Sequence, residues 1–324
     1  MNEDTKEKKS TKEVAGTSLW QDAWKRLIKN RLAVFGMLVI AFMAIAVTFG
    51  PMIIKAITGF TPEMIPSDGN LIRSFPPSLQ HPMGTDEAGR DLLARVLQGG
   101  RISLMVGVIS TVVSLIVGVS YGAVAGYFGG RIDNFMMRIV DILYSIPFIL
   151  IVIVLMSVFS GDNTPRWINW LSGLFGGGEG LSQIFLLFFS LGLVSWLTMA
   201  RVIRGQILSL KNQEFVLAAR ATGVSTFSII FRHLVPNALG PVIVYATLTI
   251  PSVMLTEAFL SFLGIGVQAP YASWGSLASD GIKNIAIFPW QLIFPGVTMA
   301  LTLFSLNFLG DGIRDALDPQ TRKF

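Results

Sequence analysis

Six stretches of mostly apolar residues alternate with polar segments along the chain. A helix needs roughly 20 apolar residues to cross a hydrocarbon core of about 30 Å, and each stretch comes close to that length. The pattern therefore predicts an all-α integral membrane protein with six transmembrane helices. The expected spans are Leu32–Ile54, Ile102–Tyr127, Met137–Phe159, Ile184–Val202, a fifth from near Ala238 to between Met254 and Leu263, and Trp290–Leu309.

Composition agrees with this pattern and excludes several kinds of site. Of the 324 residues, 52% are hydrophobic and 14% are charged, whereas soluble domains carry about 25% charged residues. The chain has no cysteine, which excludes disulfides and Cys-based metal sites, and its two histidines lie far apart in sequence. We expect no bound metal or cofactor. The net charge of +5 is ascribed to loops at the membrane surface, not to nucleic-acid binding.

The distribution of basic residues predicts the orientation in the membrane. With the N-terminus placed in the cytoplasm, 18 of the 25 Lys and Arg fall on cytoplasmic segments, as the positive-inside rule requires. Both termini are therefore expected to be cytoplasmic. The chain divides into a cytoplasmic tail with an interfacial helix (1–31), a transmembrane domain (32–310) and a cytoplasmic C-terminal tail (311–324).

The segment before the first span has an amphipathic pattern. Trp20, Trp24, Leu27 and Ile28 fall on one face of a helix over Ser18–Arg31, and basic residues occupy the rest. This pattern favours a helix that lies on the cytoplasmic leaflet. A plain polybasic topology signal is the alternative.

Catalytic motifs are absent from the sequence. No Gly-x4-Gly-Lys-Ser/Thr phosphate-binding loop occurs, so the chain is not expected to hold ATP or to be an enzyme. Acidic residues within the spans are sparse. Asp141 lies three residues from Arg138, which predicts a local ion pair on one helix face. We infer that a different chain supplies the energy for any transport.

A polar segment between the fourth and fifth spans predicts a short helix at the cytoplasmic face. Asn212 is the expected N-cap and Gly223 the expected left-handed residue that ends the helix. The small alanines allow close approach to another surface, and two large apolar residues offer anchors. The helix either docks a soluble partner or only links two spans. Its candidate contact residues are Glu214, Phe215, Leu217, Ala218, Ala219, Arg220 and Gly223, and Pro236 ends the loop.

The long outer loop contains a compact turn motif. Asp86 is expected to cap the helix that follows, and Arg90 to pair with a neighbouring aspartate. The motif either orders this loop or contacts substrate. Its candidate residues are Gly84, Thr85, Asp86, Gly89, Arg90 and Asp91.

A second candidate site lies at the end of the fifth span. Pro251 is expected to kink or end that span, and residues 259–263 to form a short re-entrant helix. Glu257 would then lie in water or in a pathway. We interpret Glu257, Phe259 and Phe262 as an outer gate.

Several of these motifs together resemble a known family. Ala218-Ala219-x3-Gly223, with Pro236 thirteen residues later, resembles the cytoplasmic loop of bacterial ABC importer permeases, although Leu217 stands where that family has glutamate. The stretches 81–91, 257–266 and 310–319 resemble the dipeptide, oligopeptide and nickel permease subfamily, and within it the oligopeptide permease C-type subunit. The likeness extends from about residue 20 to the end.

The resemblance implies a function and a set of partners. It implies a non-catalytic permease subunit of an ATP-driven oligopeptide importer in the bacterial cytoplasmic membrane. The partners would be a second homologous permease, two ATPase subunits that use ATP and Mg²⁺ and receive the segment near Phe215–Gly223, a peptide-binding protein and the bilayer. Dipeptides, nickel or another small cargo remain open. A stand-alone secondary transporter and a pathway-free membrane anchor are alternatives of a different class.

Overall fold

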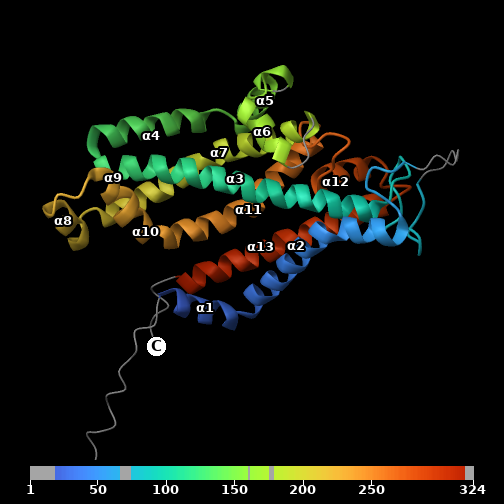
Figure 1. The fold of residues 1–324 in the computed structure, drawn as a ribbon, viewed down its shortest axis with the longest axis horizontal. Coiled ribbons are helices and arrows are strands. Elements are labelled where there is room, and N and C mark those ends of the chain that lie inside the picture. Colours follow the sequence, from blue (N-terminus) through green and yellow to red (C-terminus); the bar gives the residue numbers. More distant parts are fainter. Residues whose placement is uncertain (1–18, 66–73, 160, 175–178, 318–324) are drawn as a thin grey trace, which may run out of the picture.

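The computed structural model describes residues 19–65, 74–159, 161–174 and 179–317, which form a bundle of long helices (Figure 1). Of the predicted terminal segments, 1–31 and 311–324, residues 1–18 and 318–324 lie outside the described residues. Apart from one bridge between Thr85 and Asp91, the regular structure of the described residues is helical, as predicted. Five described helices are long and apolar enough to cross a membrane: α2 (Arg31–Thr58), α3 (Leu92–Phe128), α7 (Glu179–Leu210), α11 (Leu239–Phe262) and α13 (Trp290–Leu317).

Shorter helices connect and flank these five. They are α1 (Leu19–Lys29), α4 (Gly130–Ser145), α5 (Phe148–Val158), η2 (Gly161–Asn163), α6 (Arg166–Leu174), α8 (Glu214–Ala221), α9 (Thr226–Ser228), η3 (Ile229–Leu234, a π-helix), α10 (Val235–Asn237) and α12 (Trp274–Lys283). Figure 1 shows α8, α9 and α10 at one end of the bundle and α12 at the other. We call these the α8 end and the α12 end.

The closest helix packing in the bundle joins α3 to α7. Gly118, Gly122 and Gly126 recur every fourth residue on α3, so they form one face that lies directly against α7. A Cβ on Gly122 would overlap the backbone oxygen of Ala200. The Ser110 hydroxyl adds a hydrogen bond of 2.7 Å to the carbonyl of Phe188. Small residues allow two apolar helices to approach closely, and dispersion contacts then stabilise the pair.

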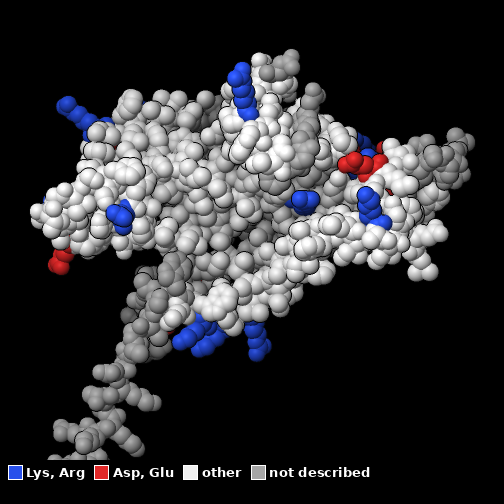
Figure 2. All heavy atoms as spheres, viewed as in Figure 1, with Lys and Arg blue, Asp and Glu red and all other residues white. Residues whose placement is uncertain are grey.

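A second layer consists of α1, α2 and α13 (Figure 1). Asn30 separates α1 from α2, because its side chain accepts hydrogen bonds from the backbone of Leu32 and Ala33 at 3.1 and 3.3 Å. Leu27 of α1 is buried with Ala33 and Ala316. The large side chains along one side of α2 are exposed, as expected for a lipid-facing surface: Leu38, Phe42, Ile45 and Phe49. Figure 2 shows basic side chains gathered beneath α1.

The third predicted span is not continuous. α4 and α5 cover it, but their axes differ by 89° across Ile146 and Pro147. Pro147 has no backbone N–H, and a residue before proline avoids the helical region. Ile146 accordingly has an extended backbone (φ −84°, ψ 128°). The bundle therefore has five unbroken candidate spans in the described residues, or six if this bent pair counts as one.

The fifth predicted span is confirmed as α11, whose end at Phe262 lies within the predicted range. α11 continues through Pro251 to Phe262, so the re-entrant helix predicted for residues 259–263 was wrong. A proline inside a helix removes one backbone hydrogen bond, but neighbouring helices make this tolerable within a membrane. Pro251 is buried in the bundle, where α11 packs on α3, α12 and α13.

We predict that Gly122→Ala destabilises the chain by about 1–3 kcal/mol, because the new methyl group overpacks the interface between α3 and α7. Gly205→Ala on α7 is the matched control, since a Cβ at Gly205 meets nothing within 4 Å. The measurement is the free energy of unfolding of each purified variant in detergent. Equal losses in both variants would contradict this packing.

Candidate functional site

The segment after α7 forms the predicted short helix. α7 ends at Leu210, and α8 begins after Gln213. Asn212 is not the N-cap: Gln213 takes that position without a side-chain hydrogen bond. Gly223 has a φ of 77°, the left-handed conformation that ends a helix at low cost in glycine. The predicted role of Gly223 as the residue that ends this helix is confirmed.

The two faces of α8 have different environments. Val216 and Ala219 are buried against η3, where they join a cluster with Ile229 and Ile230. The expectation that Ala219 lies on an outer contact face was therefore wrong. It lies three residues from Val216, and that spacing places both on the inner face. The other candidate contact residues of α8 are exposed: Glu214, Phe215, Leu217, Ala218 and Arg220.

Two basic residues fasten the α8 segment to the end of α3. The Lys211 ammonium donates a hydrogen bond of 3.0 Å to the carbonyl of Gly126, which lies in the last turn of α3. The Arg220 guanidinium lies 5.1 Å from the centre of the Tyr127 ring. Both contacts place positive charge near the C-terminus of α3, where the helix dipole favours it. α8 is thus held at a fixed place relative to α3 and α7.

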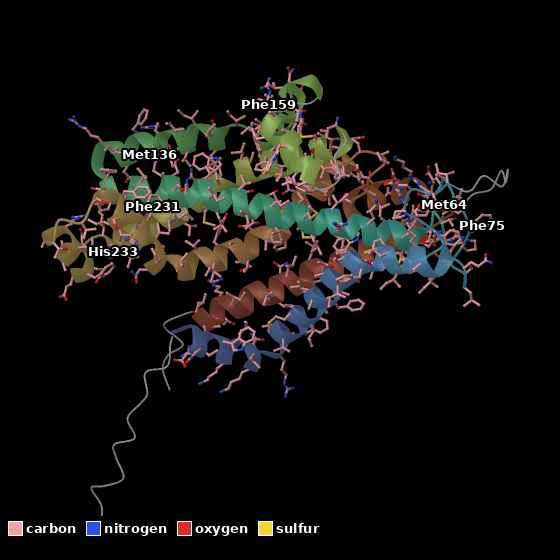
Figure 3. The ribbon with its side chains drawn as sticks, viewed as in Figure 1. Met64, Phe75, Met136, Phe159, Phe231 and His233 are labelled. Carbon is pink, nitrogen blue, oxygen red and sulfur yellow. The ribbon has the colours of Figure 1, made fainter. Side chains whose placement is uncertain are left out.

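The rest of the loop returns the chain to the bundle. η3 leads directly into α10, where Pro236 lies in the first turn. Figure 3 shows Phe231 and His233 at this α8 end, and Met64 and Phe75 at the α12 end. Residues 204–236 therefore gather at one end of the molecule, far from the turn motif of the long loop.

Two ion pairs connect α4 to α7. The Arg204 guanidinium donates to both carboxylate oxygens of Asp133, at 2.5 and 2.7 Å. One helix turn away, Arg201 donates to Asp141 at 2.8 Å and stacks over the Tyr144 ring at 4.1 Å. The predicted local pair between Asp141 and Arg138 was wrong, because Arg201 reaches Asp141 from the neighbouring helix.

A cavity of about 520 Å³ lies beside the break between α4 and α5, with α7 and α11 as its other walls. Tyr144, Ile146 and Pro147 line its side nearest the break. Tyr144 therefore touches both the cavity and the Arg201 ion pair. The end of α7 that leads into α8 is thus connected to a cavity wall through side-chain contacts.

At the α12 end, the turn motif forms the core of a loop over residues 74–91, which we call the signature loop. Gly84 and Gly89 have φ values of 76° and 81°, which favour glycine. Asp86 bonds the backbone of Ala88 and Arg90, both at 2.9 Å, and pairs with the Arg90 side chain at 2.7 Å. Asp86 thus closes a turn. The expectation that Asp86 caps α3 was wrong, because Asp91 takes that position.

Asp91 and Thr85 join the signature loop to the helices. Asp91 is the N-cap of α3: it accepts a bond of 2.8 Å from the backbone of Ala94 and lies 2.8 Å from the His81 ring nitrogen. The carbonyl of Thr85 accepts a bond of 3.0 Å from Gln291 of α13. Through these contacts the motif orders the loop and holds it against α3 and α13.

Glu257 does not lie in water. It is buried, and its carboxylate accepts bonds from Ser261 at 2.6 Å and from Ser273 at 2.7 Å. Because α11 does not end at Pro251, Glu257 faces the start of α12 and ties the two helices together. Phe259 and Phe262 are exposed on the same helix. Only these two remain accessible for the predicted gate.

Sequence reasoning missed the residues that connect the elements. Asp133, Arg204 and Lys211 carry those contacts, and the available signal was an acidic residue beside an apolar span with arginines on another span. Their pairing depends on which helices are neighbours, which a single sequence does not reveal. Among the residues that the structure describes, no three His, Asp or Glu side chains gather as a metal site requires.

Known proteins match this chain along nearly its whole length. Residues 118–323 match the family described as "Binding-protein-dependent transport system inner membrane component", and residues 18–77 match the "N-terminal TM domain of oligopeptide transport permease C". The oligopeptide transport system permease protein OppC of Haemophilus influenzae is 46% identical over 96% of this chain and 91% of its own length.

Two further relatives are similarly close. OppC of Salmonella typhimurium is 48% identical over 99% of this chain and 98% of its own length. The dipeptide transport system permease protein DppC of Bacillus subtilis is 43% identical over 94% of this chain and 87% of its own length. The predicted family resemblance is thus confirmed. The chain belongs to the family of binding-protein-dependent transport system inner membrane components, and it is a multi-pass membrane permease.

Proposed function

We propose that this chain is one of two permease subunits of an ATP-binding-cassette importer that carries oligopeptides across the bacterial cytoplasmic membrane. The names of the relatives at 46–48% identity support the cargo. The other subunits would be a homologous permease, two ATPases that use ATP and Mg²⁺, and a peptide-binding protein. Both termini and α8 would lie in the cytoplasm, and the signature loop would face the binding protein.

The exposed apolar face of α8 carries this proposal. Phe215 and Leu217 are 39% and 50% exposed on a helix that Lys211 and Arg220 fasten to α3. Exposed apolar residues on a rigidly held helix fit a groove on a soluble partner. A helix that only linked two spans would not need an exposed apolar face. We therefore assign α8 as the coupling helix, which receives the movement of the ATPase subunit.

The same contacts give that movement a route into the membrane. A displacement of α8 would move the end of α7, and the pairs of Arg204 and Arg201 would carry α4 with it. α4 also packs on α7 through Val140, which is buried with Trp196 and Ala200, so the ion pairs and this apolar contact together fix its position. Its last turn forms part of the cavity wall. Alternation between two arrangements of α4 would open or close the pathway. Phe259 and Phe262 would gate its outer mouth.

Dipeptide import is the second candidate, because a relative at 43% identity is named a dipeptide permease. Uptake of labelled dipeptides and of longer peptides, measured in cells that lack this chain and again after complementation, separates the two. Preferential restoration of the longer peptides is the expected result.

We predict that Ala218→Arg lowers complemented peptide uptake roughly ten-fold or more, because it places an unpaired charge in the contact face of α8. The chain should still reach the membrane in normal amounts, since Ala218 is exposed. Ala286→Arg, at an exposed alanine of the α12 end, is the matched control and should transport normally. Normal uptake and normal ATPase co-purification with Ala218→Arg would contradict the docking role.

We predict that Asp133→Arg lowers both uptake and thermal stability, because it replaces the buried partner of Arg204 with a like charge. The reciprocal double variant, Asp133→Arg with Arg204→Asp, should recover part of both. Asp141→Asn should cost less than about 1 kcal/mol, since its pair with Arg201 is solvent-exposed. The measurements are uptake and the unfolding midpoint in detergent. A double variant no better than Asp133→Arg would argue against the pair.

A further inference from the structure

The cavity between α4, α5, α7 and α11 has an uncharged wall rich in hydroxyl groups. Its lining includes no Asp, Glu, Lys, Arg or His. Thr249, Ser252 and Thr256 recur at intervals of three and four along α11 and so lie on one face of that helix. Ser195 and Thr198 face them from α7. The polar part of the wall thus consists of hydroxyls from two helices, with Tyr144 and Tyr245 beside them.

Three of these hydroxyls are oriented as hydrogen-bond acceptors, and a fourth, that of Thr198, bonds the Tyr144 hydroxyl. Thr249 donates its hydrogen to the carbonyl of Tyr245 at 2.8 Å, and Thr256 to that of Ser252 at 2.9 Å. Ser195 donates in the same way to Leu191 at 2.9 Å. A hydroxyl has one hydrogen and two lone pairs. Since the hydrogens of Ser195, Thr249 and Thr256 are used within their own helices, the lone pairs of these three hydroxyls can accept from another donor.

We propose that this cavity is a cargo subsite that accepts hydrogen bonds from the N–H groups of a peptide, either backbone amides or the terminal amine. The inference rests on the proposed function and adds the chemistry by which this chain holds its cargo. N–H groups that leave water need acceptors, because an unmatched buried donor is costly. A carboxylate brings only acceptors and would find the hydrogens of Ser195, Thr249 and Thr256 engaged.

An uncharged acceptor wall also explains how one pathway passes peptides of varied sequence. Backbone N–H groups are common to all peptides, whereas a charged wall would select particular side chains. The remaining lining is apolar, with Leu191, Val194 and Leu248 among it. These apolar lining residues can accommodate the side chains of a peptide without hydrogen bonds to them. The position of Tyr144, between this cavity and Arg201, places the subsite on the route from α8.

The test compares a labelled peptide with its backbone N-methylated analogue in the assembled importer, reconstituted with its binding protein. The readout is the ratio of KM values for the two cargoes, for the wild-type chain and for Thr249→Val/Thr256→Val. Valine keeps the shape of threonine and removes the acceptor. Every variant is assayed with the same binding protein. Any preference of the binding protein for one peptide therefore affects the KM ratio of every variant equally. Thr298→Val on α13 is the matched control: its hydroxyl bonds Phe294 at 2.7 Å outside the cavity.

We expect the double variant to reduce the preference for the unmethylated peptide by roughly two- to ten-fold, the range that one hydrogen bond gives. The control should keep the wild-type ratio. An unchanged ratio in the double variant, with uptake intact, would overturn the subsite but not the proposed function. If the double variant transports nothing, the single variant Thr256→Val decides: a reduced preference for the unmethylated peptide supports the subsite, and the wild-type ratio overturns it. No peptide uptake with the wild-type chain would instead overturn the proposed function.

Discussion

The close contact between α3 and α7 is the constraint on which the other features depend. Gly118, Gly122 and Gly126 let the two backbones approach until side chains of α7 occupy the space where a Cβ would lie. Within a membrane the hydrophobic effect does not distinguish protein from lipid, so such packing has to supply the association energy. The pair then acts as the rigid axis of the bundle, and the smaller helices are placed relative to it.

Both ends of this axis carry candidate sites. At the α8 end, Lys211 and Arg220 hold the α8 segment against the last turn of α3. Along α7, Arg201 and Arg204 pair with α4, which also packs there through the buried Val140. At the α12 end, Asp91 caps α3 and so fixes the signature loop. The elements at both ends are thus placed by their contacts with this one pair of helices.

The apolar stretches predicted the class of fold and most of the spans, because bilayer thickness sets helix length. Local turn chemistry was also readable, as Gly223 illustrates. Other expectations failed where a neighbouring element decides the outcome. Ala219 faces inward because η3 covers that side of α8, and Asp141 pairs with Arg201 because α7 lies beside α4. Pro147 could have predicted the break between α4 and α5 from sequence alone. Pro251, by contrast, lies inside α11, because the neighbouring helices accommodate it, and the sequence does not reveal those neighbours.

The most direct test of the account is peptide uptake into proteoliposomes that contain the purified assembly, with ATP present or absent and with an ionophore added. The account predicts uptake that requires ATP, this chain and its ATPase partners, and that persists when the ionophore removes ion gradients. Uptake by this chain alone, driven by an ion gradient and abolished by the ionophore, would contradict it.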